Sequence, residues 1–212
     1  AFGGDGGTYD IGFQALSGAM ERGHNLLYVC YNNEAYMNTG VQRSGATPRA
    51  AYTTTEPVGK IKQGKMRPRK DLTAIMAAHG IPYVAQASIG YYMDLIRKAE
   101  KAFSIVGPKF MNVLQPCRLG WVYEQARTIE LGKIAVDTCF WPLYEVENGK
   151  WKLSMKPRQK KPLVEFFKLQ DRFRHLFKPE NGPLLADLQA EVDKNWEILL
   201  EKCGEGKGEK GV

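Results

Sequence analysis

An aspartate and an asparagine, separated in sequence by a helix and a strand, are the residues of this chain whose types and spacing could do chemistry. Asp5 stands in a Gly-Asp-Gly triplet, and Asn33 is the second residue of an Asn-Asn pair. A carboxylate and an amide oxygen this far apart can hold one divalent cation only if the fold brings them together. Apolar residues recur at helical spacing over residues 11–20, and residues 26–31 (LLYVCY) indicate a buried parallel strand. The pattern therefore predicts a βαβ unit.

Such a unit would place Asp5 and Asn33 at the same edge of a sheet. Parallel strands joined by a right-handed crossover lie side by side, and they end at the edge where open α/β sheets bind ligands. Gly6 and Gly7 would let a ligand approach the backbone, and the following helix would present free N–H groups to an anion. Because hard oxygen ligands beside such a turn suit Mg²⁺, we expect a metal-bound diphosphate here. Taken singly, a Gly-Asp-Gly triplet is usually a turn and an Asn-Asn pair a strand-end cap.

At these residues the chain resembles the thiamine diphosphate enzymes, which share a GDG motif followed, after a helix and a strand, by NN. The longer segments GDGGTYDIGFQAL and YNNEAYMNTGVQRSGATP are similar to the β subunits of 2-oxoacid:ferredoxin oxidoreductases, above all those acting on pyruvate. The similarity continues through VLQPCRLGW and KPLVEFFKLQDRFRHL, so it covers nearly the whole chain apart from the tail.

The resemblance implies thiamine diphosphate and Mg²⁺ as cofactors. The metal ligands would be Asp5, Asn33 and the carbonyl of Ala35, and the backbone around Gly4, Gly6 and Gly7 would meet the phosphates.

Two further residues gain a role only from the resemblance. Asn38 matches an asparagine beside the substrate and the thiazolium, where its amide could stabilise developing charge. Without the resemblance, residues 38–40 would be interpreted as a turn. Cys117 becomes the fourth ligand of a 4Fe-4S cluster, whereas spacing alone makes it an ordinary loop cysteine.

The activity that the resemblance implies is the oxidative decarboxylation of pyruvate, with coenzyme A as acyl acceptor and ferredoxin as electron acceptor. The same chemistry on 2-oxoglutarate, branched-chain 2-oxoacids or indolepyruvate is the alternative. Another domain or subunit would supply a glutamate, so the chain would carry half a site and be inactive alone. Because the chain starts inside an expected strand, we expect it to be a fragment, and the section before the GDG motif would supply three cluster cysteines. A non-catalytic nucleotide- or phosphate-binding α/β domain is a further alternative, although residues 4–7 lack the spacing of known nucleotide-binding loops.

Length and composition fit an α/β protein with a doubly wound, mainly parallel sheet. The chain has 212 residues and 43% hydrophobic content, enough for one core. We expect a cofactor-binding domain at 1–135, a C-terminal hairpin and helical extension at 136–203, and a disordered tail at 204–212. The sequence shows no apolar run of about 20 residues and no signal peptide pattern, which favours the cytoplasm and no membrane.

The remaining notable residues are interpreted mainly as structural. The net charge is +7, and the basic run 60–70 is most often solvated surface. The basic run lacks the aromatic side chains that would stack on bases, so nucleic acid is not expected as a partner. An acidic ferredoxin or the phosphates of coenzyme A would be attracted by its positive charge. Cys30 and Cys139 are expected in the core and Cys203 in a polar tail, and the histidines are assigned no chemistry. The expected elements are helices at 71–79, 90–106, 124–131, 164–177 and 184–203, strands at 81–87 and 109–114, a hairpin over 141–153 and a long loop at 36–70.

Overall fold

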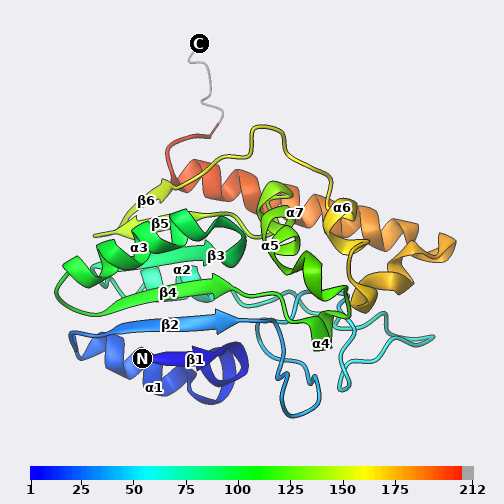
Figure 1. Ribbon diagram of the computed structural model, residues 1–212, viewed down its shortest axis with the longest axis horizontal. Coiled ribbons are helices and arrows are strands. Elements are labelled where there is room, and N and C mark those ends of the chain that lie inside the picture. Colours follow the sequence, from blue (N-terminus) through cyan, green and yellow to red (C-terminus); the bar gives the residue numbers. More distant parts are fainter. Residues whose placement is uncertain (207–212) are drawn as a thin grey trace.

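Four parallel strands and an antiparallel hairpin form one six-stranded sheet in the order β1-β2-β4-β3-β5-β6 (Figure 1). The structure is a computed structural model that describes residues 1–206. β5 runs antiparallel to β3, and β6 runs antiparallel to β5. The strands are β1 (Phe2–Gly4), β2 (Leu27–Asn32), β3 (Tyr83–Ser88), β4 (Lys109–Leu114), β5 (Tyr144–Glu147) and β6 (Lys150–Leu153).

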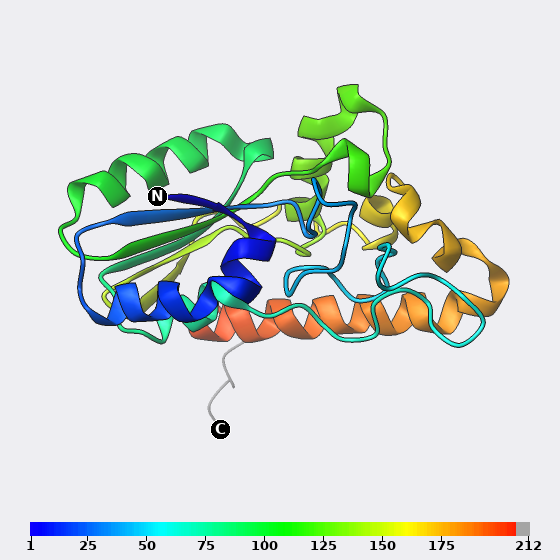
Figure 2. The same cartoon turned by 90° about the horizontal axis from the view of Figure 1, so that it is seen from below.

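Helices cover both faces of this sheet, with α3 on one face and α1 and α7 on the other (Figure 2). Side chains along β3 alternate between the two cores: Tyr83 and Ala85 pack with Ala102 of α3, whereas Val84 belongs to the larger core on the α7 side. The doubly wound, mainly parallel α/β fold is thus confirmed. The helices are α1 (Phe13–Glu21), α2 (Leu72–Ala77), α3 (Tyr92–Ser104), α4 (Arg118–Trp121), α5 (Thr128–Asp137), α6 (Val164–Phe167) and α7 (Gly182–Lys202).

The C-terminal hairpin extends the sheet. Asn148 and Gly149 both have positive φ angles, 48° and 76°, as a two-residue type I′ turn requires. The expected hairpin is therefore confirmed, and it is shorter than expected. Leu188 and Trp196 of α7 pack in the same core as Val84 of β3. The division between residues 135 and 136 stays a prediction.

Helix ends follow local chemistry where a cap is present. Asp71 accepts a hydrogen bond from the Ala74 N–H at 3.0 Å and starts α2, as the sequence predicts. The single helix expected over 164–177 is wrong, because α6 ends at Phe167 and Asp171–Phe177 forms 3₁₀ turns. The extended backbone of Gln170 separates the two segments, and it lets the rings of Phe167 and Phe173 stack with centroids 3.9 Å apart.

The end of α7 is a Schellman cap. Gly204 has a φ of 71°, and the Glu205 N–H donates to the carbonyl of Leu200 at 2.8 Å. Gly204 thus belongs to the end of α7, the disordered tail expected at 204–212 stays a prediction, and residues 207–212 lie outside the described residues. Within residues 1–206, no helix combines the length and the apolar character needed to cross a membrane.

Two glycines allow α5 to contact the backbone just before α3. A Cβ at Gly90 would lie 2.4 Å from the backbone carbon of Gly132. We therefore expect Gly90→Ala to lower the free energy of unfolding by about 1–3 kcal/mol, measured by denaturant titration. Gly182→Ala is the control, because a Cβ there meets nothing within 4 Å. Equal losses in the two variants would contradict the close-packing argument.

Candidate functional site

The carboxyl ends of β1, β2 and β4 bring the candidate site residues together. Gly4 pairs with Tyr31 in the parallel register of β1 and β2, so Asp5 and Asn33 both lie just beyond the strand ends. The Asn33 N–H donates to Oδ1 of Asp5 at 3.3 Å. The fold therefore closes the 28-residue separation between the two side chains, as the βαβ pattern predicts.

Two oxygens of this edge lie close to the side-chain oxygen of Asn33. The side-chain oxygen of Asn33 lies 2.8 Å from Oδ1 of Asp5 and 2.9 Å from the carbonyl oxygen of Ala35. With its amide turned over, Asn33 would instead donate hydrogen bonds to both oxygens. In an octahedral Mg²⁺ site with bonds of about 2.1 Å, neighbouring ligand oxygens are about 3 Å apart. The observed spacing therefore fits this donor set around a small divalent cation, which would fix the orientation of the amide.

The donor set contains a single carboxylate. Within residues 1–206 there is no group of three or more His, Cys, Asp or Glu side chains that could hold a metal. A cation bound by Asp5, Asn33 and Ala35 would thus need further oxygens from phosphate and water, which is how Mg²⁺ is commonly held beside phosphate groups.

Asp5 is buried, and the hydrogen bonds of its carboxylate replace only part of the hydration that it loses. Its side chain is 1% exposed, and Ser44 Oγ donates to Oδ2 at 2.5 Å. Burial raises the pKa of Asp5 to about 7, since the hydrogen bonds from Ser44 and Asn33 offset only part of the lost hydration and the Glu34 charge raises the pKa further. A cation against Oδ1 would favour the charged form.

The glycines after the first strand leave the backbone accessible on one side only. A Cβ at Gly6 would lie 2.4 Å from the ring of Tyr36, whose hydroxyl donates to the Gly6 carbonyl at 2.9 Å. A Cβ at Gly7 would meet nothing within 4 Å, so an anion could approach the main chain there. The segment Gly7–Ile11 is a π-helical turn that leads into α1, where the sequence predicts a regular helix start.

The other two candidates lie in loops. Asn38 is exposed, in a turn between the paired residues Tyr36 and Gln42. Cys117 is half-buried and follows β4 by three residues, just before α4. Its segment is attached to the Asp5 edge, because the indole N–H of Trp121 donates to the Asn33 carbonyl at 2.8 Å. The roles of Asn38 and Cys117 stay predictions.

The other cysteines behave as packing residues. Cys30 and Cys139 are buried, which raises the pKa of the first thiol to about 12 and of the second to about 11 and confirms both as core residues. Cys203 packs against the core at the end of α7, so its assignment to a polar tail is wrong.

A buried ion network that the sequence pattern does not predict lies behind the site. Within the basic run 60–70, which the sequence predicts to be solvated surface, Lys65 and Arg69 turn inward, whereas the side chain of Lys70 is 47% exposed. Lys65 is 1% exposed and donates to the Thr47 carbonyl at 2.5 Å. Arg69 binds Glu34 at 3.1 Å, and Lys70 donates to the carbonyl of Tyr9 at 2.6 Å. One signal was available, since an acidic residue such as Glu34 between two candidate metal ligands needs a cation if it is buried.

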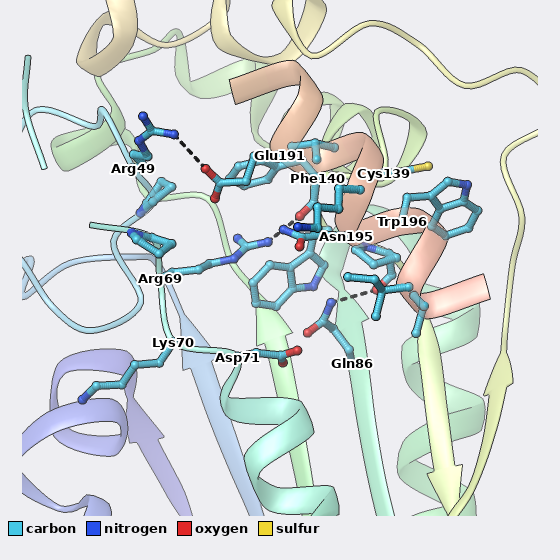
Figure 3. A pocket seen from close by; sticks show the side chains of 18 of the residues that line it. Arg49, Arg69, Lys70, Asp71, Gln86, Cys139, Phe140, Glu191, Asn195 and Trp196 are labelled. Carbon is cyan, nitrogen blue, oxygen red and sulfur yellow. Dashed lines mark hydrogen bonds and ion pairs between the residues drawn. The ribbon is translucent and has the colours of Figure 1, made fainter. Parts of the chain in front are cut away.

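A cavity of about 550 Å³ lies beside this edge, between the sheet and α7 (Figure 3). Its walls include Phe140, Trp141 and Trp196, and none of the three converging oxygens belongs to a lining residue. The lining polar groups are mostly bound within the protein: Arg49 pairs with Glu191 at 3.1 Å, for example. This cavity is therefore adjacent to the candidate site and distinct from it.

Comparison with known proteins gives consistent matches. Residues 1–113 match the family model described as thiamine pyrophosphate enzyme, C-terminal TPP binding domain. The chain is 56% identical over 199 residues to pyruvate synthase subunit PorB of Methanocaldococcus jannaschii, covering 94% of this chain and 65% of that protein. It is 52% identical over 201 residues to the same subunit of Thermotoga maritima, covering 94% and 62%. The identity to ketoisovalerate oxidoreductase subunit VorB of Pyrococcus abyssi is 48% over 198 residues, covering 92% and 62%.

A solved structure agrees with the fold. A 2-oxoglutarate:ferredoxin oxidoreductase from Magnetococcus marinus, with 2-oxoglutarate, coenzyme A and succinyl-CoA bound, superposes with a TM-score of 0.51 and 26% identity over 55% of this chain and 38% of that chain. The present chain spans less than two thirds of the length of the curated relatives described above. The family match covers the β1–β4 edge on which Asp5, Asn33 and Ala35 converge. The chain therefore belongs to the thiamine pyrophosphate enzymes, of which it carries the C-terminal cofactor-binding domain.

Proposed function

We propose that this chain is the catalytic, thiamine diphosphate-binding β subunit of a pyruvate:ferredoxin oxidoreductase. The observation that carries the proposal is the convergence of the Asp5, Asn33 and Ala35 oxygens inside the segment that matches the family. The similarity to subunits named pyruvate synthase, at 56% identity for one of them, supports pyruvate over other 2-oxoacids.

In this proposal Asp5, Asn33 and the carbonyl of Ala35 hold Mg²⁺, and the backbone at Gly6 and Gly7 holds the diphosphate. Thiamine diphosphate supplies a reactive carbon and an electron sink, which no amino-acid side chain provides. The task of the chain is to anchor the diphosphate and to exclude water. Ser44 contributes by donating to Oδ2 of Asp5, which leaves Oδ1 facing Asn33.

The proposed overall reaction converts pyruvate and coenzyme A to acetyl-CoA and CO₂, and two ferredoxins are each reduced by one electron. The supporting parallel is the solved oxidoreductase, whose name includes ferredoxin and which has coenzyme A bound. Asn38 would donate its amide to the substrate oxygen, and Cys117 would give one of four thiolates to a 4Fe-4S cluster. Partner subunits would complete the site, so the chain is inactive alone. A cytoplasmic location, expected from the sequence, is part of the proposal.

The test is substrate-dependent reduction of ferredoxin by the full-length chain assembled with its partner subunits. We expect turnover that requires both thiamine diphosphate and coenzyme A, with kcat/KM for pyruvate above those for 2-oxoglutarate and ketoisovalerate. A preference for ketoisovalerate would reassign the substrate, and no dependence on thiamine diphosphate would refute the function.

Cys117→Ser should spare cofactor binding but impair electron delivery. Serine oxygen is a harder ligand than thiolate, so a cluster bound through it becomes labile or changes its potential. In the assembled enzyme we expect an altered electron paramagnetic resonance spectrum and slowed ferredoxin reduction, with unchanged affinity for thiamine diphosphate. Cys203→Ser is the matched control, since it also replaces a partly buried cysteine outside the strands. An unaltered set of clusters in the Cys117 variant would show that Cys117 is not a cluster ligand.

A further inference from the structure

Glu34 lies between two of the proposed metal ligands in a strained backbone conformation. Its φ is 67°, in the left-handed region, and its side chain is 0% exposed. That conformation is unfavourable for a residue with a side chain and persists only where the surroundings enforce it. Because Asn33 and Ala35 are its chain neighbours, the Glu34 backbone sets the direction of the Asn33 amide and of the Ala35 carbonyl.

Every polar group of Glu34 is held by a partner. Its N–H donates to Oδ1 of Asn32 at 3.0 Å, and its carbonyl accepts from the Thr47 hydroxyl at 2.6 Å. The carboxylate is shared by two guanidinium groups, with Oε1 at 3.1 Å from Arg69 and Oε2 at 2.6 Å from Arg172. The residue is therefore fixed at both its main chain and its side chain.

Arg172 is the most distant of these partners in sequence and is almost completely enclosed. Its side chain is 3% exposed, and its Nε donates to Oε1 of Gln170 at 2.8 Å. The guanidinium carbon lies 3.9 Å from the ring centroid of Trp121, the residue whose indole holds the Asn33 carbonyl. Arg172 thus binds Glu34 directly and packs on the ring of Trp121, the residue that holds the neighbouring Asn33 carbonyl.

We propose that Arg172, together with Arg69, is a positioning residue that acts through Glu34 to hold the Asn33 amide and the Ala35 carbonyl in the geometry that binds Mg²⁺ and thiamine diphosphate. The inference rests on the proposed function of the Asp5 edge. The C-terminal extension, which lies outside the family match at 1–113, thereby becomes part of cofactor binding.

A contribution to folding stability alone would not explain why Glu34 is paired with Arg69 and Arg172 in the interior. Replacing a buried ion pair by apolar residues is often neutral or stabilising, whereas removing one partner leaves an uncompensated charge. A purely structural pair and a positioning pair differ in one measurable respect, because only the second changes cofactor affinity beyond its effect on folding. The chain offers a comparison, since Lys98 of α3 is also 3% exposed and pairs with Asp94 at 2.6 Å, on the other face of the sheet from α1 and α7 (Figure 2).

The experiment measures the Mg²⁺-dependent affinity for thiamine diphosphate by calorimetry, with the full-length chain assembled with its partner subunits. Arg172→Lys keeps the charge but loses the planar, two-sided contact with Glu34 and Trp121. We expect it to weaken cofactor binding about 10–100-fold, the usual effect of losing a residue that orients a metal ligand. Lys98→Met should lower the melting temperature and leave the affinity unchanged. An unchanged affinity in Arg172→Lys, or an equal loss in both variants, would overturn the proposal.

A second pair of variants separates action through Glu34 from any independent effect. If Arg172 acts through Glu34, the double variant Glu34→Gln/Arg172→Lys should bind no more weakly than the weaker-binding single variant, whereas losses that add would refute the route. Glu34→Gln keeps the size of the side chain, so it tests the proposal even if Arg172→Lys does not fold. The variant Asp5→Asn separates failure of the proposed metal site from failure of the positioning role of Arg172. Normal affinity in Asp5→Asn would refute the metal site itself, while a loss there combined with normal affinity in Arg172→Lys would refute only the positioning role.

Discussion

Asp5→Ala is expected to abolish Mg²⁺-dependent binding of thiamine diphosphate by the assembled enzyme. The carboxylate is the one charged group among the three converging oxygens, so its removal leaves only neutral protein oxygens for the cation. The loss should exceed the roughly 10–100-fold penalty typical of residues that merely support a metal ligand. Asn33→Ala removes a neutral ligand and should weaken binding less. Calorimetry of thiamine diphosphate binding at fixed Mg²⁺ concentration measures both effects.

Unfolding can be separated from ligand loss in this variant. Burial raises the pKa of Asp5 from 3.8 to about 7, so the ionised side chain opposes folding of the cofactor-free protein increasingly as pH rises between these values. At pH 8, removing it relieves that cost, and we expect the cofactor-free variant to stay folded. Asp187→Ala is the control, because it removes an exposed carboxylate of α7. A folded Asp5→Ala protein with normal cofactor affinity would contradict the metal assignment.

Asn38→Ala is expected to retain the cofactor and lose turnover. The proposed role of its amide is toward the reacting substrate, so diphosphate binding should not change. Loss of one oriented donor at a developing charge costs about 2.7–4 kcal/mol, or about a hundred- to thousandfold in kcat. Steady-state rates of pyruvate-dependent ferredoxin reduction measure the effect.

The control for this prediction is the neighbouring residue of the same exposed turn. Thr39 donates to Oε1 of Gln42 at 2.6 Å, so Thr39→Ala perturbs the turn without touching the Asn38 amide. Near-normal turnover in Asn38→Ala, or the same loss in both variants, would make Asn38 an ordinary turn residue.

The elements that the sequence predicts correctly depend on short-range chemistry. The strand at 109–114 and the cap at Asp71 follow from local hydrophobicity and from one side-chain hydrogen bond. The meeting of Asp5 and Asn33 follows from the geometry of a βαβ unit, which needs no knowledge of the rest of the chain.

The features that sequence reasoning missed depend on contacts between distant segments. Arg172 turns inward to a partner 138 residues away, and it lies in 3₁₀ turns where the sequence predicts a continuous helix over 164–177. Lysine and arginine usually lie at the surface. Lys65 and Arg69 turn inward because a buried carbonyl binds the first and a buried carboxylate binds the second. No local pattern carries this information, because the partner of each cation lies in another part of the chain.

The central position of β4 governs the order in which the sheet can be completed. β4 is the last of the four parallel strands to leave the ribosome, yet it lies between β2 and β3 and pairs with both. Until residue 114 has been synthesised, β2 and β3 each present an unpaired edge, and such edges are templates for association with other chains. The parallel sheet is therefore completed by insertion of its last strand between β2 and β3, not by addition of strands outward from β1. Nascent chains that end before residue 109 lack β4, so we expect them to aggregate through the unpaired edges of β2 and β3.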